Sequence, residues 1–176
     1  SLWNIASSEG IVTPMTYYYL GWCLHQGGLS GVKQAFADAV KACPDYCFPN
    51  RLEAILALQC AMVQNPDDAR APYYLGNLYY DKRQYDLAME AWETSARLDG
   101  SFPTVWRNLA LAFFNKKNEE AKAIECMERA FRLDTTDARI LMELDQLYKR
   151  VRRSHKERLA FLQQYPELIK QRDDLI

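Results

Sequence analysis

The chain contains 176 residues, of which 49% are hydrophobic and 26% are charged, and its net charge is −1. This balance is typical of a folded globular domain and excludes an intrinsically disordered chain. A nucleic-acid-binding protein usually carries a basic excess, so the near-neutral total gives no support to nucleic acid as a partner.

The sequence also indicates the setting of the protein. No apolar run reaches the ~18 to 20 residues that cross a bilayer, so we expect no membrane partner. The five cysteines are odd in number and irregularly spaced, which does not fit a disulfide framework. We therefore expect a reducing, cytoplasmic setting. The chain begins at Ser1 with neither Met nor a signal-peptide pattern, and we expect it to be cut from a longer protein.

The first part of the chain predicts helices between irregular segments. We expect an irregular N-terminal segment over residues 1–12 and degenerate helical repeats over 13–68, with helices at about 13–24, 30–42 and 50–64. Asn65-Pro66-Asp67-Asp68 indicates a turn followed by an aspartate that caps the next helix.

The second part has a more regular apolar period. It predicts helices over residues 70–82, 85–98, 103–116, 118–132, 137–150 and 154–164, and a last one that starts at Pro166. No stretch alternates like a β-strand. We expect an all-α fold of about nine to ten helices.

The same residue types return at a nearly fixed interval. Gly76 and Ala110 are 34 residues apart, and Ala110 and Asp145 are 35 apart. A small residue at this anchor position lets two helices approach closely, while Trp92 and Met127 fill the middle of the second helix. Asp145 departs from the pattern, so its close helix contact is in doubt.

This period and pattern resemble the tetratricopeptide repeat. The resemblance implies a right-handed α-α superhelix of antiparallel helix pairs, with repeats over 69–165 divided into 69–102, 103–137 and 138–165. Residues 166–176 would then be a truncated final helix. Its apolar face, involving Leu168, Ile169 or Leu175, would be exposed, and weak homodimerisation through this end is left open.

In this family the first helix of each pair lines the concave surface. The resemblance therefore implies a peptide groove at Arg70, Tyr73, Asn77, Tyr80, Arg107, Asn108, Arg139, Glu143 and Gln146. Such residue types suit the recognition of an extended peptide. The groove-facing positions also include Tyr74, Leu111, Phe114 and Met142. The alternative is that Tyr74, Leu111 and Phe114 belong to the core and the rest is a solvated face.

One subtype of the family binds acidic carboxyl-terminal peptides through a two-carboxylate clamp. Asn77, Asn108 and Arg139 match its pattern, but Tyr73 and Glu143 stand where two cations are required. A carboxylate at position 143 would repel an acidic ligand, which argues against the clamp.

Two further clusters favour structural interpretations. Cys43 and Cys47 are separated by three residues rather than the two of redox motifs, and no second pair completes a zinc site, so they are interpreted as loop and core thiols. The basic cluster Lys149, Arg150, Arg152, Arg153, Lys156 and Arg158 is interpreted as a solvated surface, with a phosphate or an acidic partner as the alternative.

The sequence thus predicts a non-catalytic scaffold module that binds a protein or peptide, without catalytic, cofactor-binding or metal-binding residues. A second resemblance supplies another hypothesis. The segments APYYLGNLYYDKRQY, LDQLYKR and QRDDL resemble the repeat region of large bacterial proteins that have a carbohydrate-related amino-terminal region. It implies an accessory region of a carbohydrate-active enzyme, which would pack on another domain of the same chain.

Overall fold

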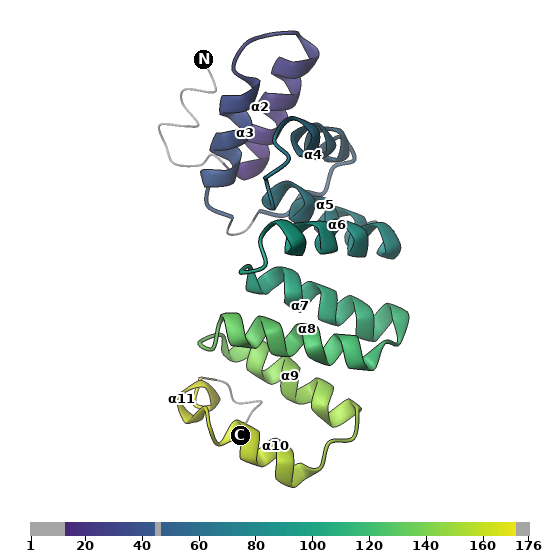
Figure 1. Ribbon diagram of the computed structural model, residues 1–176, viewed down its shortest axis with the longest axis vertical. Helices are drawn as coiled ribbons and strands as arrows, with labels where there is room; N and C mark the ends of the chain where they lie inside the picture. The colour runs from purple at the N-terminus through teal and green to yellow at the C-terminus, as the bar shows by residue number, and fades with distance from the viewer. Residues whose placement is uncertain (1–12, 45–46, 172–176) are drawn as a thin grey trace. The chain divides into compact units, whose positions relative to one another are not determined.

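The computed structural model describes residues 13–44 and 47–171. The segment predicted to be irregular, 1–12, and residues 172–176 of the predicted last helix lie outside this range. Every regular element within the described residues is helical, so the predicted all-α fold class is confirmed (Figure 1). The chain divides after Asp99 into two compact units. Among the described helices none is long and apolar enough to cross a membrane.

The first unit contains all the helices that were predicted before Asp99, with their ends within three residues of the expected positions. They are α2 (Pro14–Gln26), α3 (Val32–Lys41), α4 (Glu53–Gln64), α5 (Arg70–Asp81) and α6 (Tyr85–Leu98).

Helices α5 and α6 pack closely because Gly76 has no side chain. A Cβ atom at Gly76 would lie 2.4 Å from Cδ1 of Trp92, which is closer than two non-bonded carbon atoms can approach. The Trp92 ring is 3% exposed, and its Nε1 donates a hydrogen bond of 3.1 Å to Oδ1 of Asn77. The ring is therefore fixed against the glycine, as the small anchor residue predicts.

Helices α2 and α3 show the same contact between a glycine and an aromatic ring, which the 34-residue period did not predict. A Cβ atom at Gly21 would lie 2.5 Å from Cε1 of Phe36, and the Phe36 ring is fully buried. Gly21 and Gly76 are 55 residues apart, which is no multiple of the 34-residue period. The additional helix α4 between the two pairs accounts for the longer interval.

Asp68 joins α2 to the start of α5. Its Oδ1 accepts hydrogen bonds from the backbone N–H groups of Arg70 at 2.8 Å and Ala71 at 3.2 Å, which is the predicted capping contact. The hydroxyl of Tyr18 donates to Oδ2 at 2.8 Å. Both side chains are buried, and burial raises the pKa of Asp68 and of Tyr18.

The second unit contains one element that the sequence did not predict. Its helices are α7 (Pro103–Ala112), η1 (Phe113–Lys117), α8 (Glu120–Leu133), α9 (Ala138–Arg150), α10 (His155–Leu162) and α11 (Pro166–Ile169). The prediction of a single α-helix over 103–116 is wrong at its end, because residues 113–117 form a π-helix.

The π-helix accommodates an extra residue in the repeat. Ala88 follows Gly76 by 12 residues, whereas Ala123 follows Ala110 by 13. A π turn is wider than an α turn and takes up one residue without breaking the helix. Asn118, with φ of 56°, then ends the helix in the left-handed region.

The third pair replaces the small anchor residue by an ion pair. Asp145 is 7% exposed, and Nε of Arg158 on α10 donates to its Oδ1 at 2.8 Å. A second bond joins Nη2 of Arg158 to Oδ2 of Asp145. The interpretation of Arg158 as solvated surface is therefore wrong. Arg153 is also engaged, since its guanidinium lies 3.7 Å from the centroid of the Tyr148 ring.

The predicted exposed apolar face near the C-terminus is wrong for Leu168, which is only 8% exposed. Helix α11, which carries this leucine, packs against α9. The α-helix predicted over residues 166–176 ends at Ile169, and Leu175 lies outside the described residues. Three aromatic rings lie close together just before α11. The ring centroids of Phe161 and Tyr165 are 5.5 Å apart, and those of Phe131 and Tyr165 are 4.9 Å apart.

We expect Trp92→Ala to lower the free energy of unfolding by about 3 to 5 kcal/mol, because it removes a buried ring from the α5–α6 contact. Urea denaturation measures this loss. Leu87→Ala on the same helix is the matched control, since Leu87 is 43% exposed. A loss below about 1 kcal/mol for Trp92→Ala would mean that the ring does not hold the pair together.

We expect Asp68→Ala to lower the free energy of unfolding by about 2 to 3 kcal/mol, because the buried hydroxyl of Tyr18 and two backbone N–H groups lose their acceptor. Thermal and urea denaturation measure the change. Asp67→Ala, at the exposed neighbouring carboxylate, should have no measurable effect. Equal behaviour of the two variants would show that the buried hydrogen bonds do not stabilise the unit.

Candidate functional site

The first helix of each repeat pair has one buried face and one partly exposed face. In α7, for example, Val105, Leu109 and Ala110 are buried, whereas Arg107 and Leu111 are half-buried. None of the nine predicted groove residues is buried. Arg139 and Gln146 are exposed, and the others are half-buried: Arg70, Tyr73, Asn77, Tyr80, Arg107, Asn108 and Glu143. Tyr74 is 1% exposed and belongs to the core.

In the first unit, the predicted groove residues contact their own helix pair. Asn77 accepts the hydrogen bond from Trp92. The Tyr80 ring lies 5.4 Å from the Trp92 ring and 5.1 Å from the Tyr85 ring, measured between centroids. Tyr73 lies 5.2 Å from Tyr74. These side chains therefore present an aromatic surface that is held in place from below.

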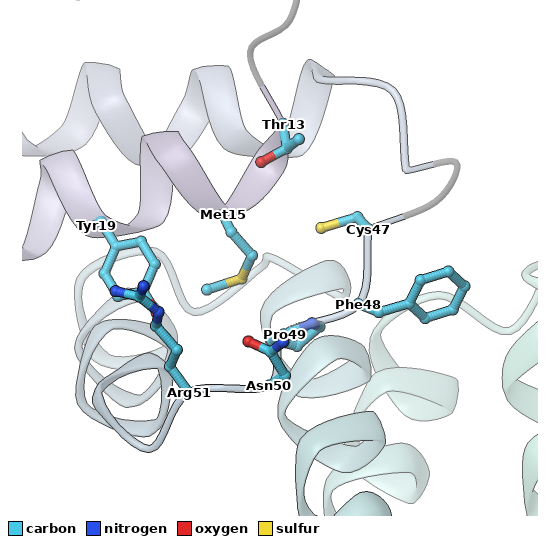
Figure 2. A pocket seen from close by; sticks show the side chains of 8 residues that line it. All are labelled: Thr13, Met15, Tyr19, Cys47, Phe48, Pro49, Asn50 and Arg51. Carbon is cyan, nitrogen blue, oxygen red and sulfur yellow. The ribbon is translucent and has the colours of Figure 1, made fainter.

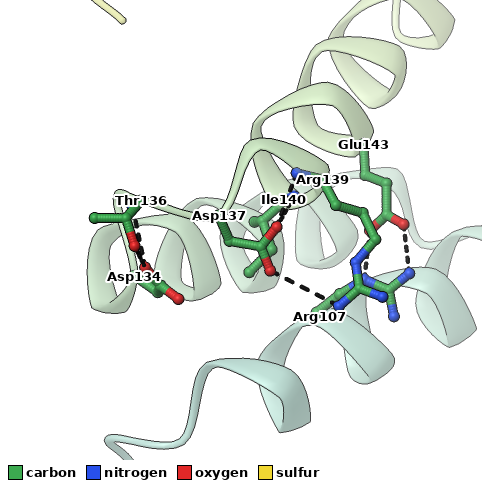
Figure 3. Close-up of polar contacts among 7 residues, drawn as sticks. All are labelled: Arg107, Asp134, Thr136, Asp137, Arg139, Ile140 and Glu143. Atoms are coloured by element: carbon green, nitrogen blue, oxygen red, sulfur yellow. Dashed lines mark hydrogen bonds and ion pairs between the residues drawn. The ribbon is translucent and has the colours of Figure 1, made fainter. Parts of the chain in front are cut away.

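In the second unit, Arg107 on α7 and Glu143 on α9 form a bidentate ion pair (Figure 3). Nε of Arg107 donates to Oε2 of Glu143 at 2.6 Å, and the side chains are 18% and 15% exposed. Glu143 is therefore neutralised by a residue of the same surface. Glu143 holds the guanidinium of Arg107 in this ion pair, so Arg107 is not available to an acidic carboxyl terminus. This contact argues further against the two-carboxylate clamp.

Arg139 lies at the first turn of α9 beside the residue that caps this helix. Oδ1 of Asp137 accepts from the backbone N–H groups of Arg139 at 2.8 Å and Ile140 at 3.2 Å. The other oxygen, Oδ2, lies 3.7 Å from Nη2 of Arg139 (Figure 3). The exposed charge of Arg139 is thus partly balanced at one end of the surface.

A second contact between α9 and the helix that precedes α8 was missed by the sequence analysis. The guanidinium of Arg150 lies 5.2 Å from the centroid of the Phe114 ring. Phe114 is half-buried, although the alternative interpretation placed it in the core, and Arg150 was assigned to a solvated cluster. The sequence spacing could have indicated this contact. Arg107 precedes Phe114 by seven residues, and Glu143 precedes Arg150 by seven, so the two pairs are in matching positions.

Two hollows lie elsewhere, in the first unit. One of 280 Å³ is lined by Thr13, Met15, Tyr19, Cys47, Phe48, Pro49, Asn50 and Arg51. Figure 2 shows Met15 of α2 pointing toward Pro49 across it and Tyr19 on the side of Arg51, while the 73% exposed Phe48 points away. The other, of 290 Å³, is lined by residues of α2 and α4: Trp22, His25, Gln26, Leu56, Gln59, Cys60, Val63 and Gln64. Neither includes a predicted groove residue.

The cysteines of the Cys43–Cys47 motif differ in their environments. Cys43 is exposed, and Cys47 is buried with the pKa of its thiol raised by that burial. No disulfide joins any of the five cysteines. Over the described ranges, no group of three or more His, Cys, Asp and Glu side chains is arranged to hold a metal ion.

Comparison with known proteins identifies the repeat. Residues 76–117 match the family model described as TPR repeat, the tetratricopeptide repeat. This segment includes the anchors Gly76 and Ala110. The predicted resemblance to the tetratricopeptide repeat is therefore confirmed.

Several solved structures share the fold. MamA from Desulfovibrio magneticus RS-1 is 21% identical, with 91% of this chain and 77% of that chain covered and a TM-score of 0.57. The Yersinia enterocolitica type III secretion chaperone SycD, in complex with a peptide of the translocator YopD, is 21% identical, with 77% and 92% covered and a TM-score of 0.51. Pseudomonas aeruginosa pilF is 18% identical, with 90% and 75% covered and a TM-score of 0.53.

We expect Arg107 and Glu143 to be energetically coupled, because their bidentate ion pair is mostly shielded from water. A double-mutant cycle with Arg107→Gln and Glu143→Gln, measured by urea denaturation, should give a coupling of about 1 to 2 kcal/mol. The same cycle on the exposed pair Lys170 and Glu167 should give no measurable coupling. Additive effects of the two glutamine substitutions would show that the ion pair does not join α7 to α9.

Proposed function

We propose that the chain is a non-catalytic module that binds a protein or peptide on the partly exposed faces of its first helices. The observation that carries this proposal is the degree of burial of the groove residues. In the second unit, Leu111, Phe114 and Met142 are apolar but only half-buried, on the same helices whose other faces are fully buried. A partner that covers them completes their removal from water.

The polar side chains around this surface supply specificity. Asn108 and Gln146 carry amide groups that both donate and accept hydrogen bonds, as the backbone of an extended peptide requires. Arg107 and Glu143 are fixed to each other, so they offer a rigid edge at low entropic cost. The first unit has a partly exposed surface of its own, where Tyr73 and Tyr80 offer rigid aromatic area of the kind that is enriched in protein interfaces.

The similar structures support a binding function. SycD was solved with a peptide of YopD, so a protein with this fold holds a peptide from another protein. The alternative of an accessory region in a carbohydrate-active enzyme receives no support from MamA, SycD or pilF. We keep the cytoplasm as the proposed location and another protein as the proposed partner. Homodimerisation through the C-terminal end has lost part of its basis, because Leu168 is buried within its own unit.

We expect Leu111→Glu to weaken peptide binding, because a carboxylate between Arg107 and Phe114 disfavours an apolar contact with the peptide. Peptides selected from a displayed random library against the chain serve as probes, and fluorescence anisotropy measures their affinity. The expected loss is at least ~10-fold, the effect of removing ~1.4 kcal/mol of binding energy.

Leu133→Glu is the matched control, since Leu133 is an apolar residue of α8 with 40% exposure. Circular dichroism establishes that both variants remain folded. Peptides that bind the two variants equally well, or a library that yields no binding peptide, would contradict the proposed function.

A further inference from the structure

Two contacts between α9 and the helical segment from α7 to η1 bound a short strip of the candidate surface. The Arg107–Glu143 ion pair lies at one end, and the Arg150–Phe114 contact lies at the other. Seven residues separate the contacts on both sides, which corresponds to about 10 Å of helix. The strip is therefore long enough for about three residues of an extended peptide.

The residues between the two contacts are Leu111 and Gln146. Leu111 follows Arg107 by four residues and precedes Phe114 by three, so helical periodicity places it on the same face. Gln146 lies correspondingly between Glu143 and Arg150. Leu111 is half-buried and Gln146 is exposed. The middle of the strip therefore offers an apolar contact beside an amide.

The two ends of the strip differ in charge. Arg107 is bonded through two nitrogen atoms to Glu143 and carries no unbalanced charge. Arg150 instead faces the ring of Phe114, and among the described residues no carboxylate forms an ion pair with Arg150 or Lys149. The Arg107–Glu143 pair is thus neutral, whereas the Arg150 end is cationic.

A ligand carboxylate would bind favourably at the cationic end. A charge-assisted hydrogen bond to Arg150 is stronger than the exposed contact of its guanidinium with an aromatic ring. When the guanidinium turns toward the carboxylate, the Phe114 ring is freed to pack on the ligand. At the other end a carboxylate would meet the Arg107–Glu143 pair, in which Glu143 already takes up the hydrogen-bond donors of Arg107.

From this asymmetry we propose that the strip binds a peptide segment with an apolar side chain on Leu111 and a single carboxylate at the Arg150 end. The inference rests on the proposed function, to which it adds the chemistry of the ligand. It makes Arg150 the residue that selects acidic peptides and Glu143 the residue that limits them to one carboxylate.

The probes are four nine-residue peptides with acetylated and amidated ends, a fluorescein label and a central leucine in a glycine–serine background. One has an aspartate two positions before the leucine, one has it two positions after, one has both and one has none. Including both placements makes the test independent of the direction in which the peptide lies. Fluorescence anisotropy gives the dissociation constants.

We expect one single-aspartate peptide to bind at least ~10-fold more tightly than the uncharged peptide, and Arg150→Gln to remove this advantage. The second aspartate should add less than a factor of two in the wild-type chain. Glu143→Gln should make the double-aspartate peptide bind several-fold more tightly, because Arg107 is then released.

One control separates the local charge from the net charge. Arg132→Gln removes an exposed cation of α8 and should have no effect. Equal losses for Arg150→Gln and Arg132→Gln, or tightest binding of the uncharged peptide, would overturn the inference.

Failure of the inference can be told from failure of the proposed function. If none of the four designed peptides binds while library-selected peptides bind and depend on Leu111, the ligand chemistry inferred for the strip is wrong and the binding function stands. If the selected peptides also fail to bind, or bind independently of Leu111, both are overturned.

Discussion

The contact between a glycine and an aromatic ring is the constraint on which the first unit depends. Gly76 leaves no room for a Cβ atom beneath Trp92, and Gly21 leaves none beneath Phe36. One face of α5 is thereby packed against α6, and one face of α2 is packed against α3. In the second unit a larger anchor is accommodated by a different interaction, since Asp145 forms a buried ion pair with Arg158. These intramolecular contacts decide which faces remain half-exposed.

The candidate site follows from this packing rather than from a deep cavity. A helix with one face packed against its partner has a limited set of side chains left to offer, and on α7 and α9 these include Leu111 and Gln146. Internal contacts then determine which of the remaining charges are available to a ligand. Glu143 forms an ion pair with Arg107, whereas the guanidinium of Arg150 contacts the Phe114 ring. The surface therefore combines a neutral end with a cationic end, and recognition depends on both.

The sequence predicts the fold well because helix periodicity and anchor spacing are local properties. It could not predict the pairing of Gly21 with Phe36, because α4 interrupts the repeat interval. It also placed Arg158 on the solvated surface, since nothing local indicates that Asp145 is buried beside it. The degree of exposure of the groove positions was implied only by the family resemblance. The partners of Glu143 and Arg150 depend on contacts between helices about 36 residues apart, which a single sequence does not reveal.

The most direct test of the account is a methyl NMR spectrum of the chain, recorded before and after addition of a library-selected peptide. We predict that the signals of Leu111 and Met142 shift in proportion to the bound fraction. The signals of Leu56 and Val63, which line the hollow between α2 and α4, should keep their positions. Shifts at Leu56 and Val63 without shifts at Leu111 and Met142 would place the peptide in that hollow and contradict the account.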